Sequence, residues 1–396
     1  MALRVLLAHN RYMEQGGEDS AFEADVALLR RHGHFVAELV EDSSRIGGMG
    51  QARLAARTIW STDSRKRVAE SIEETHPDVI HFHNTFPLLS PSVYSASASY
   101  AIPVVQTLHN FRLLCPNGLF YRDGHVCEDC MGRFFPWPGV LHACYRRSRP
   151  ASGVVAAMLS FHRLLGTWEK RVDTYIVLTN HAKEKFIQGG LPKEKVVVRP
   201  NFVDPDPGGS EGEAKPYALF VGRLSQEKGV RILLTAWGFA RGIPLVMIGD
   251  GPLSSELEGL VKSRELSNVK LIGHQPHPRV LGALKGARFL IVPSVCHEAF
   301  SLAVVEAFAA GVPVVASRLG AMAEIVDDRR TGLLFEPGNA EDLADKVKWL
   351  WSNPDESEAM GREARREFEQ KYTAEQAYQG LMAIYSRLIA AMRGNG

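Results

Sequence analysis

The chain has 396 residues, of which 45% are hydrophobic and 23% charged, with 35 Gly and 21 Pro. These values exclude collagen, coiled coil and wholesale disorder, and at roughly 100–200 residues per domain the length predicts two domains of similar size. The formal net charge of +1 excludes a strongly basic nucleic-acid binder, so we expect no nucleic-acid partner.

Membrane spans, a secretion signal and a disulfide scaffold are also not expected. No apolar run approaches the roughly 18 residues that cross a bilayer, and the stretch Leu3–Ala8 is too short for a signal-peptide core. Five cysteines in so long a chain do not make a disulfide framework. Together these features predict a cytoplasmic protein of enzyme size.

Short β-branched runs alternate with helical stretches through the first 200 residues. Between the first two runs, Glu18–Arg31 carries apolar side chains at helical spacing and is stopped by Gly33. Strands separated by helices imply right-handed crossovers and a parallel sheet with helices on both faces. The expected strands are Arg4–Ala8, Val36–Val40, Val79–Phe82, Val104–Thr107, Tyr175–Leu178 and Val196–Arg199.

Residues 201–216 have no periodicity and are rich in Pro, Gly and acid, which predicts a linker between a first domain, 1–200, and a second, 217–372. Residues 373–396 open with Thr373 and Gln376 at capping-box spacing and carry an apolar stripe, so we expect a helix that returns to the first domain. The expected strands of the second domain are Ala218–Val221, Leu245–Ile248, Lys270–Ile272, Phe289–Val292, Val312–Ala316 and Gly332–Phe335.

The pattern thus predicts two doubly wound α/β domains. Ligands of such domains bind at the carboxyl ends of the strands, so two domains facing each other would hold a ligand in the cleft between them. Neither domain carries the Gly-x-Gly-x-x-Gly fingerprint or a Gly-x4-Gly-Lys-Ser/Thr loop. Dinucleotide hydride transfer and P-loop chemistry are therefore not expected.

The most informative stretch runs from the strand Phe289–Val292 into a helix that begins near Ser301. Free backbone N–H groups at Ser301 and Leu302 would form an anion site, bracketed by Glu298 and Glu306. A nucleotide sugar has the matching form, an anionic diphosphate with hydroxyl-rich groups on both sides. The alternative is that Glu298 caps the helix and Glu306 is a solvated first-turn acid, both favoured by the helix dipole. The glutamate pair alone does not distinguish this from a ligand site.

Other loops at expected strand ends add chemistry. Arg223 and Lys228 are cations that suit a leaving diphosphate, although a solvated basic loop looks the same. The turn Gly249–Pro252 lets backbone approach a ligand. In the first domain, the glycine pair at 16–17 opens a helix, and His109 follows the strand beginning at Val104; a histidine there suits either a ligand site or a structural role.

Taken together, these segments resemble the retaining glycosyltransferases of the GT-B fold, specifically glycosyltransferase family 4. The family's Glu-x-Phe-Gly segment, with a second Glu eight residues after the first, reads Glu298-Ala-Phe300-Ser301 through Glu306, with Ser301 in place of the commonest Gly. The Gly-Arg-Leu…Glu-Lys-Gly loop and the Gly-Asp-Gly-Pro turn also match. The resemblance covers nearly the whole chain and implies two Rossmann-like domains.

The resemblance also implies a role for each matching residue. Arg223 and Lys228 would hold the diphosphate, Glu298 and His109 would contact the donor sugar, and Glu306 would bind the ribose. No enzyme nucleophile and no cofactor are implied for transfer. The resulting catalytic set is Arg223, Lys228, Glu298 and His109, and the substrate-binding set is Gly16, Gly17, Gly222, Gly249, Gly251, Phe300, Ser301, Leu302 and Glu306.

Four cysteines fall in the irregular stretch 114–148: Cys115, Cys127, Cys130 and Cys144. A Cys-x2-Cys pair with two further cysteines suits a structural zinc ion that would fold an insert with little core of its own. Free thiols and two disulfides are the alternatives, although disulfides rarely persist in the compartment where nucleotide sugars are found.

Residues 131–200 hold twelve Lys/Arg and four acids, a local charge of +8. Arg133-Phe-Phe-Pro-Trp-Pro and Arg146-Arg-Ser-Arg149 put apolar and cationic groups close together, which suits an anionic lipid surface or a lipid-diphosphate acceptor; a solvated basic face is the alternative. The sequence therefore predicts a retaining glycosyltransferase acting on a saccharide or lipid-linked saccharide in envelope or exported polysaccharide synthesis, cytoplasmic or peripheral on the inner face of the membrane. The rival predictions are a nucleotide-sugar epimerase and a non-catalytic nucleotide-sugar-binding protein.

Overall fold

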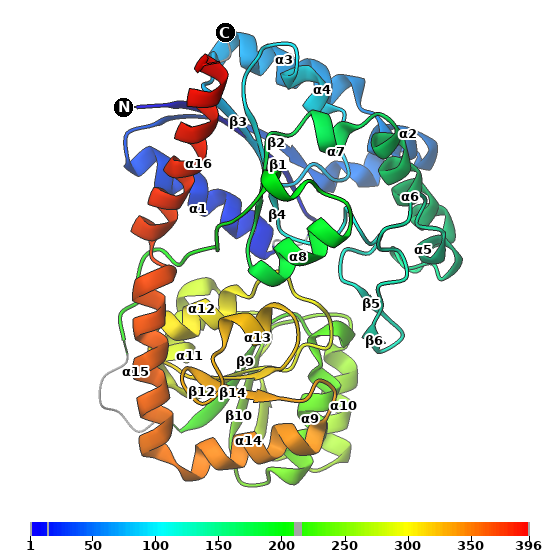
Figure 1. Cartoon of the computed structure of the whole chain (residues 1–396). Helices are drawn as coiled ribbons and strands as arrows, with labels where there is room; N and C mark the ends of the chain where they lie inside the picture. Colours follow the sequence, from blue (N-terminus) through cyan, green and yellow to red (C-terminus); the bar gives the residue numbers. More distant parts are fainter. Residues whose placement is uncertain (1, 14–15, 210–215, 395–396) are drawn as a thin grey trace. The chain divides into compact units, whose positions relative to one another are not determined.

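The computed structural model describes residues 2–13, 16–209 and 216–394, and the chain divides into two compact units (Figure 1). Residues 210–215 of the expected linker lie outside the described residues. Along the described residues, no helix is both long and apolar enough to cross a bilayer. The first unit comprises Met1–Phe120, Glu128–Pro200 and Ala377–Gly396, and the second comprises Tyr121–Cys127 and Asn201–Gln376.

The first unit is built on a six-stranded sheet in the order β2-β1-β3-β4-β7-β8, with every neighbouring pair parallel. Strands β3, β4 and β7 are buried along their whole length, as expected for a parallel sheet covered on both faces. The strand order reverses between β1 and β3, which makes this the switch point where ligands of doubly wound sheets bind. The strands are β1 (Arg4–Arg11), β2 (Phe35–Asp42), β3 (Val79–Phe82), β4 (Val104–Leu108), β7 (Thr174–Val177) and β8 (Val196–Val198).

Helices fill the crossovers of this unit. The first begins at Gly17 with Glu18 and Asp19 in its first turn and ends with Arg30 and Arg31, an arrangement that complements the helix dipole. The helices are α1 (Gly17–Arg31), α2 (Gln51–Ile59), α3 (Thr62–Thr75), α4 (Val93–Ser97), α5 (Trp137–Leu141), α6 (Arg149–Leu164), α7 (Thr167–Lys170) and α8 (Asn180–Gln188), with 3-10 turns η1 (Ser43–Gly48) and η2 (Lys193–Lys195).

The last helix, α16 (Ala374–Gly394), packs on the first unit, as the sequence predicts (Figure 1). The Gln376 N–H donates to Thr373 Oγ1 at 3.3 Å, so the expected cap residue begins the helix. Leu381 and Tyr385 are fully buried in a core that also contains Phe22 of α1. The C-terminal segment thereby completes the hydrophobic core begun by the first residues of the chain.

The second unit contains a six-stranded parallel sheet in the order β11-β10-β9-β12-β13-β14. Numbered within the unit, this is the 3-2-1-4-5-6 order of the Rossmann fold, and its switch point lies between β9 and β12. The strands are β9 (Tyr217–Val221), β10 (Leu245–Ile248), β11 (Val269–Leu271), β12 (Ala287–Val292), β13 (Val314–Ser317) and β14 (Gly332–Phe335).

Seven α-helices, α9 to α15, lie in the described part of the second unit's segment 217–376, and an eighth, α16, begins at Ala374 and continues into the first unit. The predicted class, two Rossmann-like α/β domains of the GT-B type, is confirmed. A two-stranded hairpin, β5 (Tyr121–Arg122) with β6 (His125–Val126), was not expected. The remaining elements are η3 (Gln226–Lys228), α9 (Val230–Phe239), α10 (Ser254–Ser263), α11 (His277–Gly286), α12 (Leu302–Ala309), α13 (Ala321–Ile325), α14 (Ala340–Ser352) and α15 (Pro354–Lys371).

Candidate functional site

The switch point of the second unit brings two predicted residues into contact. Lys228 ends the turn η3 after β9, and Glu298 lies in the loop after β12. The Lys228 Nζ donates to Glu298 Oε1 at 2.9 Å, and the Ser294 hydroxyl donates to the same oxygen. A cation and a carboxylate separated by 70 residues in sequence therefore meet where a ligand of this fold is expected.

Glycines allow the loops at this point to approach one another. Gly229 has a φ of +69°, and a Cβ there would lie 1.8 Å from the carbonyl oxygen of Pro293. Beside it, the Val295 N–H donates to the Glu227 carbonyl at 2.9 Å. Gly249 has a φ of +141°, and a Cβ would lie 1.8 Å from the Gly222 carbonyl oxygen. Any side chain at either glycine would push the loops apart.

The surroundings of this pair keep Lys228 charged. The Glu298 side chain is 8% exposed and that of Lys228 is 32% exposed. Burial works to lower the pKa of Lys228, but Glu298, Cys296 and Glu227 outweigh it, so the pKa is raised and the ammonium keeps its charge. Burial and the neighbouring Glu298 raise the pKa of the Cys296 thiol, which stays protonated.

The helix after this loop carries the second predicted glutamate. Ser301 is the N-cap of α12, so Glu298 does not occupy the cap position. Glu306 lies farther along α12 with its side chain 13% exposed, and its Oε1 is 2.8 Å from His277 Nε2. It is not a solvated first-turn acid. His277 begins α11, and its hydrogen bond with Glu306 raises the pKa of His277. Sequence reasoning missed this histidine, since nothing in Pro276-His277-Pro278 indicates a partner.

Arg223, Phe300 and Leu302 are the remaining predicted side chains of the second unit, in the segments that carry Lys228 and Glu298. Arg223 is exposed just after β9, and Phe300 is half-buried against the core, with its ring 6.2 Å from that of Tyr372. Leu302 is the first residue of α12, directly after the buried Ser301. The donor-side residues expected from the sequence thus occupy loops after β9, β10 and β12, at one edge of one sheet.

The first unit has a pocket at the carboxyl ends of β3 and β4, beside the first turn of α1. Its polar lining includes Glu18, His109 and Arg112, and Asn110 Nδ2 donates to Glu18 Oε1 at 2.5 Å. Burial raises the pKa of Glu18. The predicted Gly16 is the N-cap of α1 and leads into this carboxylate. Its apolar wall includes Phe86, Tyr94, Leu113, Met158 and Trp168.

His109 contacts a second histidine at the pocket. His109 Nε2 lies 3.1 Å from His83 Nδ1, and the two rings stack with centroids 5.2 Å apart. Burial, His9 and Arg199 lower the pKa of His109 to about 3, so its ring is neutral. His83 was missed from the sequence, although His81-Phe82-His83 at the end of an expected strand could have pointed to it.

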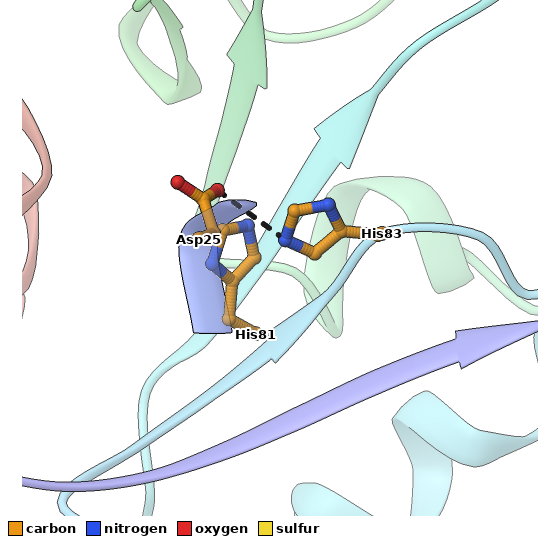
Figure 2. Close-up of side chains that lie close together, drawn as sticks. All are labelled: Asp25, His81 and His83. Carbon is orange, nitrogen blue, oxygen red and sulfur yellow. Dashed lines mark ion pairs between the residues drawn. The ribbon is translucent and has the colours of Figure 1, made fainter. Parts of the chain in front are cut away.

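Figure 2 shows the group among the described residues that comes closest to a metal-binding arrangement: Asp25 of α1, His81 of β3 and His83, whose ligand atoms lie within 4.8 Å of one another. Both ring nitrogens of His81 are already engaged, Nδ1 with the Tyr385 hydroxyl and Nε2 with the Thr107 hydroxyl, each at 2.7 Å. Both oxygens of Asp25 accept from the Arg199 guanidinium, at 2.6 and 3.1 Å. A group so engaged, beside a buried cation, does not fit a metal ion.

The predicted zinc site is not assembled. Over the described residues, which include Cys115, Cys127, Cys130 and Cys144, no three of the four sulfurs lie within 4.8 Å of one another. Cys115 Sγ donates instead to Asn117 Oδ1 at 2.9 Å, and Cys130 Sγ to the Pro136 carbonyl at 3.8 Å. In this arrangement the two sulfurs bond to neighbouring loop atoms, and the zinc site stays a prediction.

Comparison with protein families gives two adjacent matches. Residues 21–207 match the family model described as Glycosyltransferase Family 4, and residues 207–367 match the model described as Glycosyl transferases group 1. The two matches meet at residue 207 and together run from 21 to 367.

Curated relatives match over part of their length. An uncharacterized glycosyltransferase of Methanocaldococcus jannaschii is 34% identical over 209 residues, 52% of this chain and 58% of the relative. The D-rhamnosyltransferase WbpZ of Pseudomonas aeruginosa is 31% identical over 160 residues, 40% of this chain and 42% of the relative. The chain spans about half the length of the curated relatives it matches.

Solved structures match over nearly the whole chain. Sucrose-phosphate synthase from Thermosynechococcus elongatus superimposes with a TM-score of 0.73 at 18% identity, covering 98% of this chain and 100% of the other. Anabaena HepE in complex with UDP superimposes with a TM-score of 0.68 at 19% identity, covering 96% and 99%. At these identities the likeness establishes the fold.

Proposed function

Because the chain belongs to glycosyltransferase family 4, we propose that it is a retaining glycosyltransferase that moves a sugar from a nucleotide diphosphate-sugar to a saccharide or lipid-linked saccharide acceptor. The observation that carries the proposal is the contact of Lys228 with Glu298 at the switch point of the second unit, beside the start of α12. This is the chemistry that a diphosphate joined to a sugar requires: a cation, free backbone N–H groups and a hydrogen-bonding carboxylate.

In this proposal, the second unit binds the donor. Lys228 and Arg223 hold the diphosphate together with the backbone N–H groups of Ser301 and Leu302, while Glu298 accepts hydrogen bonds from the transferred sugar. The relative from Anabaena was solved with UDP, which supports a nucleoside diphosphate as the leaving group here. Lys228 loses part of its contact with Glu298 when it turns to the phosphates, and the freed carboxylate oxygen becomes available to a sugar hydroxyl.

The reaction proposed is a same-face substitution. The bond from the anomeric carbon to the diphosphate oxygen breaks, the acceptor oxygen bonds to the same face of that carbon, and the leaving phosphate takes the acceptor's proton. Negative charge grows on the diphosphate as the bond breaks, and the two cations and the helix start stabilise it. Transfer by this route requires no cofactor and no covalent enzyme intermediate.

Glu306 is proposed to bind the ribose, far from the breaking bond, so its contribution is nearly equal in the ground and transition states. Glu306→Gln is expected to raise the apparent KM for the donor roughly tenfold to a hundredfold, the worth of one hydrogen bond to a charged group, with kcat little changed. Steady-state kinetics against donor concentration measure this, with Glu258→Gln on the exposed face of α10 as the control. A loss of kcat at unchanged KM would contradict the assignment.

The direct test of the function is incubation with a panel of nucleotide sugars, with and without saccharide and polyprenyl-linked acceptors. Release of the nucleoside diphosphate that depends on an acceptor, with the anomeric configuration kept in the product, is the expected result. A changed sugar on an intact diphosphate would indicate an epimerase. Tight donor binding with no turnover under any condition would indicate a non-catalytic binding protein.

The first unit carries a surface that suits a lipid-linked acceptor at a membrane. Arg146, Arg147 and Arg149 are exposed, and in the same segment large apolar side chains are exposed as well. Apolar groups that enter the headgroup region beside cations that pair with anionic lipids are the two components of interfacial binding. The exposed apolar residues are Phe134, Phe135, Trp137, Leu141, Phe161, Leu164 and Leu165.

The triple variant Arg146→Glu, Arg147→Glu, Arg149→Glu is expected to lose binding to anionic liposomes, since each charge near such a surface contributes about 1 kcal/mol. Co-sedimentation with phosphatidylglycerol vesicles at low salt measures it. Arg53→Glu, Arg65→Glu and Lys66→Glu, three exposed cations of the same unit, form a control with the same change in net charge. An equal loss of vesicle binding in both variants would mean that the binding depends on the net charge of the protein and not on the residues at 146–149.

A further inference from the structure

We propose that His83 is a positioning residue that fixes the tautomer of His109, so that His109 offers Nδ1 as a hydrogen-bond acceptor to a hydroxyl in the pocket of the first unit. The inference rests on the proposed function only for its effect on transfer. The tautomer itself follows from contacts among Asp25, His83 and His109 and is testable in the protein without ligand.

The first step is the state of Asp25. Its two oxygens accept from the Arg199 guanidinium at 2.6 and 3.1 Å, and the two side chains are 3% and 4% exposed. A carboxylate held in a two-pronged pair with arginine is a pure acceptor. Every group that faces it must therefore present hydrogen rather than a lone pair.

The second step is the orientation of hydrogen on His83. Its Nε2 faces Asp25 Oδ2 at 3.6 Å (Figure 2). A lone pair on Nε2 would be repelled by this oxygen, so the hydrogen of the neutral ring belongs on Nε2. His83 is neutral because burial and the neighbouring histidines hold its pKa well below the ordinary range. A neutral imidazole with hydrogen on Nε2 has its lone pair on Nδ1.

The third step carries this to the pocket. His83 Nδ1 lies 3.1 Å from His109 Nε2, and a lone pair on the former requires hydrogen on the latter. His109, also neutral, then has its lone pair on Nδ1. His109 lines the pocket, so a ligand hydroxyl that reaches this nitrogen donates a hydrogen bond to it.

The same network limits what His109 does. With the pKa of His109 lowered to about 3, by burial first and then by His9 and Arg199, its ring is too weak a base to remove a proton at neutral pH. It orients a hydroxyl instead. The neighbouring His81 is fixed by hydrogen bonds of its two ring nitrogens with the Tyr385 and Thr107 hydroxyls, and it lies beside the same Asp25 carboxylate.

The tautomer is read directly by nitrogen NMR of the full-length chain labelled with 15N-histidine, with the His109 signals assigned by their loss in His109→Ala. A protonated Nε2 and an unprotonated Nδ1 are expected in the parent. His83→Phe keeps a ring beside Phe22, whose centroid is 5.4 Å away, and removes the acceptor, so the His109 tautomer should shift toward Nδ1–H or become mixed. Hydrogen on Nδ1 in the parent, or no change in the variant, overturns the proposal.

Kinetics then test the consequence. His83→Phe should lower kcat/KM for transfer about tenfold, the worth of a lost hydrogen bond, whereas His83→Asn, which places an amide oxygen near the former Nδ1, should recover part of the loss. In the His109→Ala background the change at His83 should have no further effect, because His83 acts through His109. Additive losses overturn the positioning role. If no nucleotide sugar is turned over, the proposed function fails, and the NMR result still decides the tautomer.

Discussion

Lys228→Ala is expected to lower turnover about 10²–10³-fold while the fold stays intact. Charge grows on the diphosphate as the sugar leaves, so a cation at that point binds the transition state more tightly than the ground state. Glu298 and its neighbours keep the pKa of Lys228 raised, so this cation is present across the neutral range. Both kcat and kcat/KM should fall, measured as acceptor-dependent release of nucleoside diphosphate.

The substitution also removes a partner from Glu298, which is 8% exposed and would keep the Ser294 hydroxyl as a donor. Thermal unfolding of the variant therefore has to accompany the kinetics. Lys262→Ala, an exposed lysine on α10, is the matched control and should behave as the parent. If Lys228→Ala turns over normally while Glu306→Gln is inactive, the cation is a surface charge and Glu306 lies at the reacting centre.

Much of the fold was predictable because buried parallel strands are continuous apolar runs. Val79–Phe82, Leu245–Ile248 and Gly332–Phe335 have the predicted bounds. β1 extends to Arg11 rather than Ala8 because His9 and Asn10, although polar, are fully buried and hydrogen-bonded by Asp19 and Ser43. A polarity pattern does not reveal a buried polar residue whose partner lies elsewhere in the chain.

The residues of the candidate site were also predictable where their signals are local in the sequence, and not where they depend on distant partners. Loops that follow strands were located from local signals, which is why Lys228, Glu298 and the start of α12 were found. Pairs that form only in the folded chain were not: His277 meets Glu306 across 29 residues, and Asp25 meets Arg199 across 174. For the four cysteines, spacing along the chain does not fix where the loops place the sulfur atoms: among the described residues no three of these sulfurs lie within 4.8 Å of one another, and the zinc site stays a prediction.

The buried pair between Asp25 and Arg199 is expected to have the largest effect on stability. Arg199 also donates from Nε to the Ala377 carbonyl at 3.1 Å, so one guanidinium joins α1, the end of β8 and the start of the C-terminal segment. Arg199→Leu leaves the Asp25 carboxylate buried without its cation, and removing one partner of such a pair costs about 3–5 kcal/mol. Urea unfolding should show this loss in the free energy of unfolding.

Two further variants separate a buried charge from lost packing. Asp25→Leu combined with Arg199→Leu removes both charges and should recover part of the stability, since a buried ion pair replaced by apolar groups is often neutral. The control is Arg11→Leu, which breaks an exposed pair between Arg11 at the end of β1 and Glu23 of α1, the helix that also carries Asp25. It should cost no more than about 1 kcal/mol. If Arg199→Leu is as mild as Arg11→Leu, water reaches Asp25, and that carboxylate is not the fixed acceptor that orients His83.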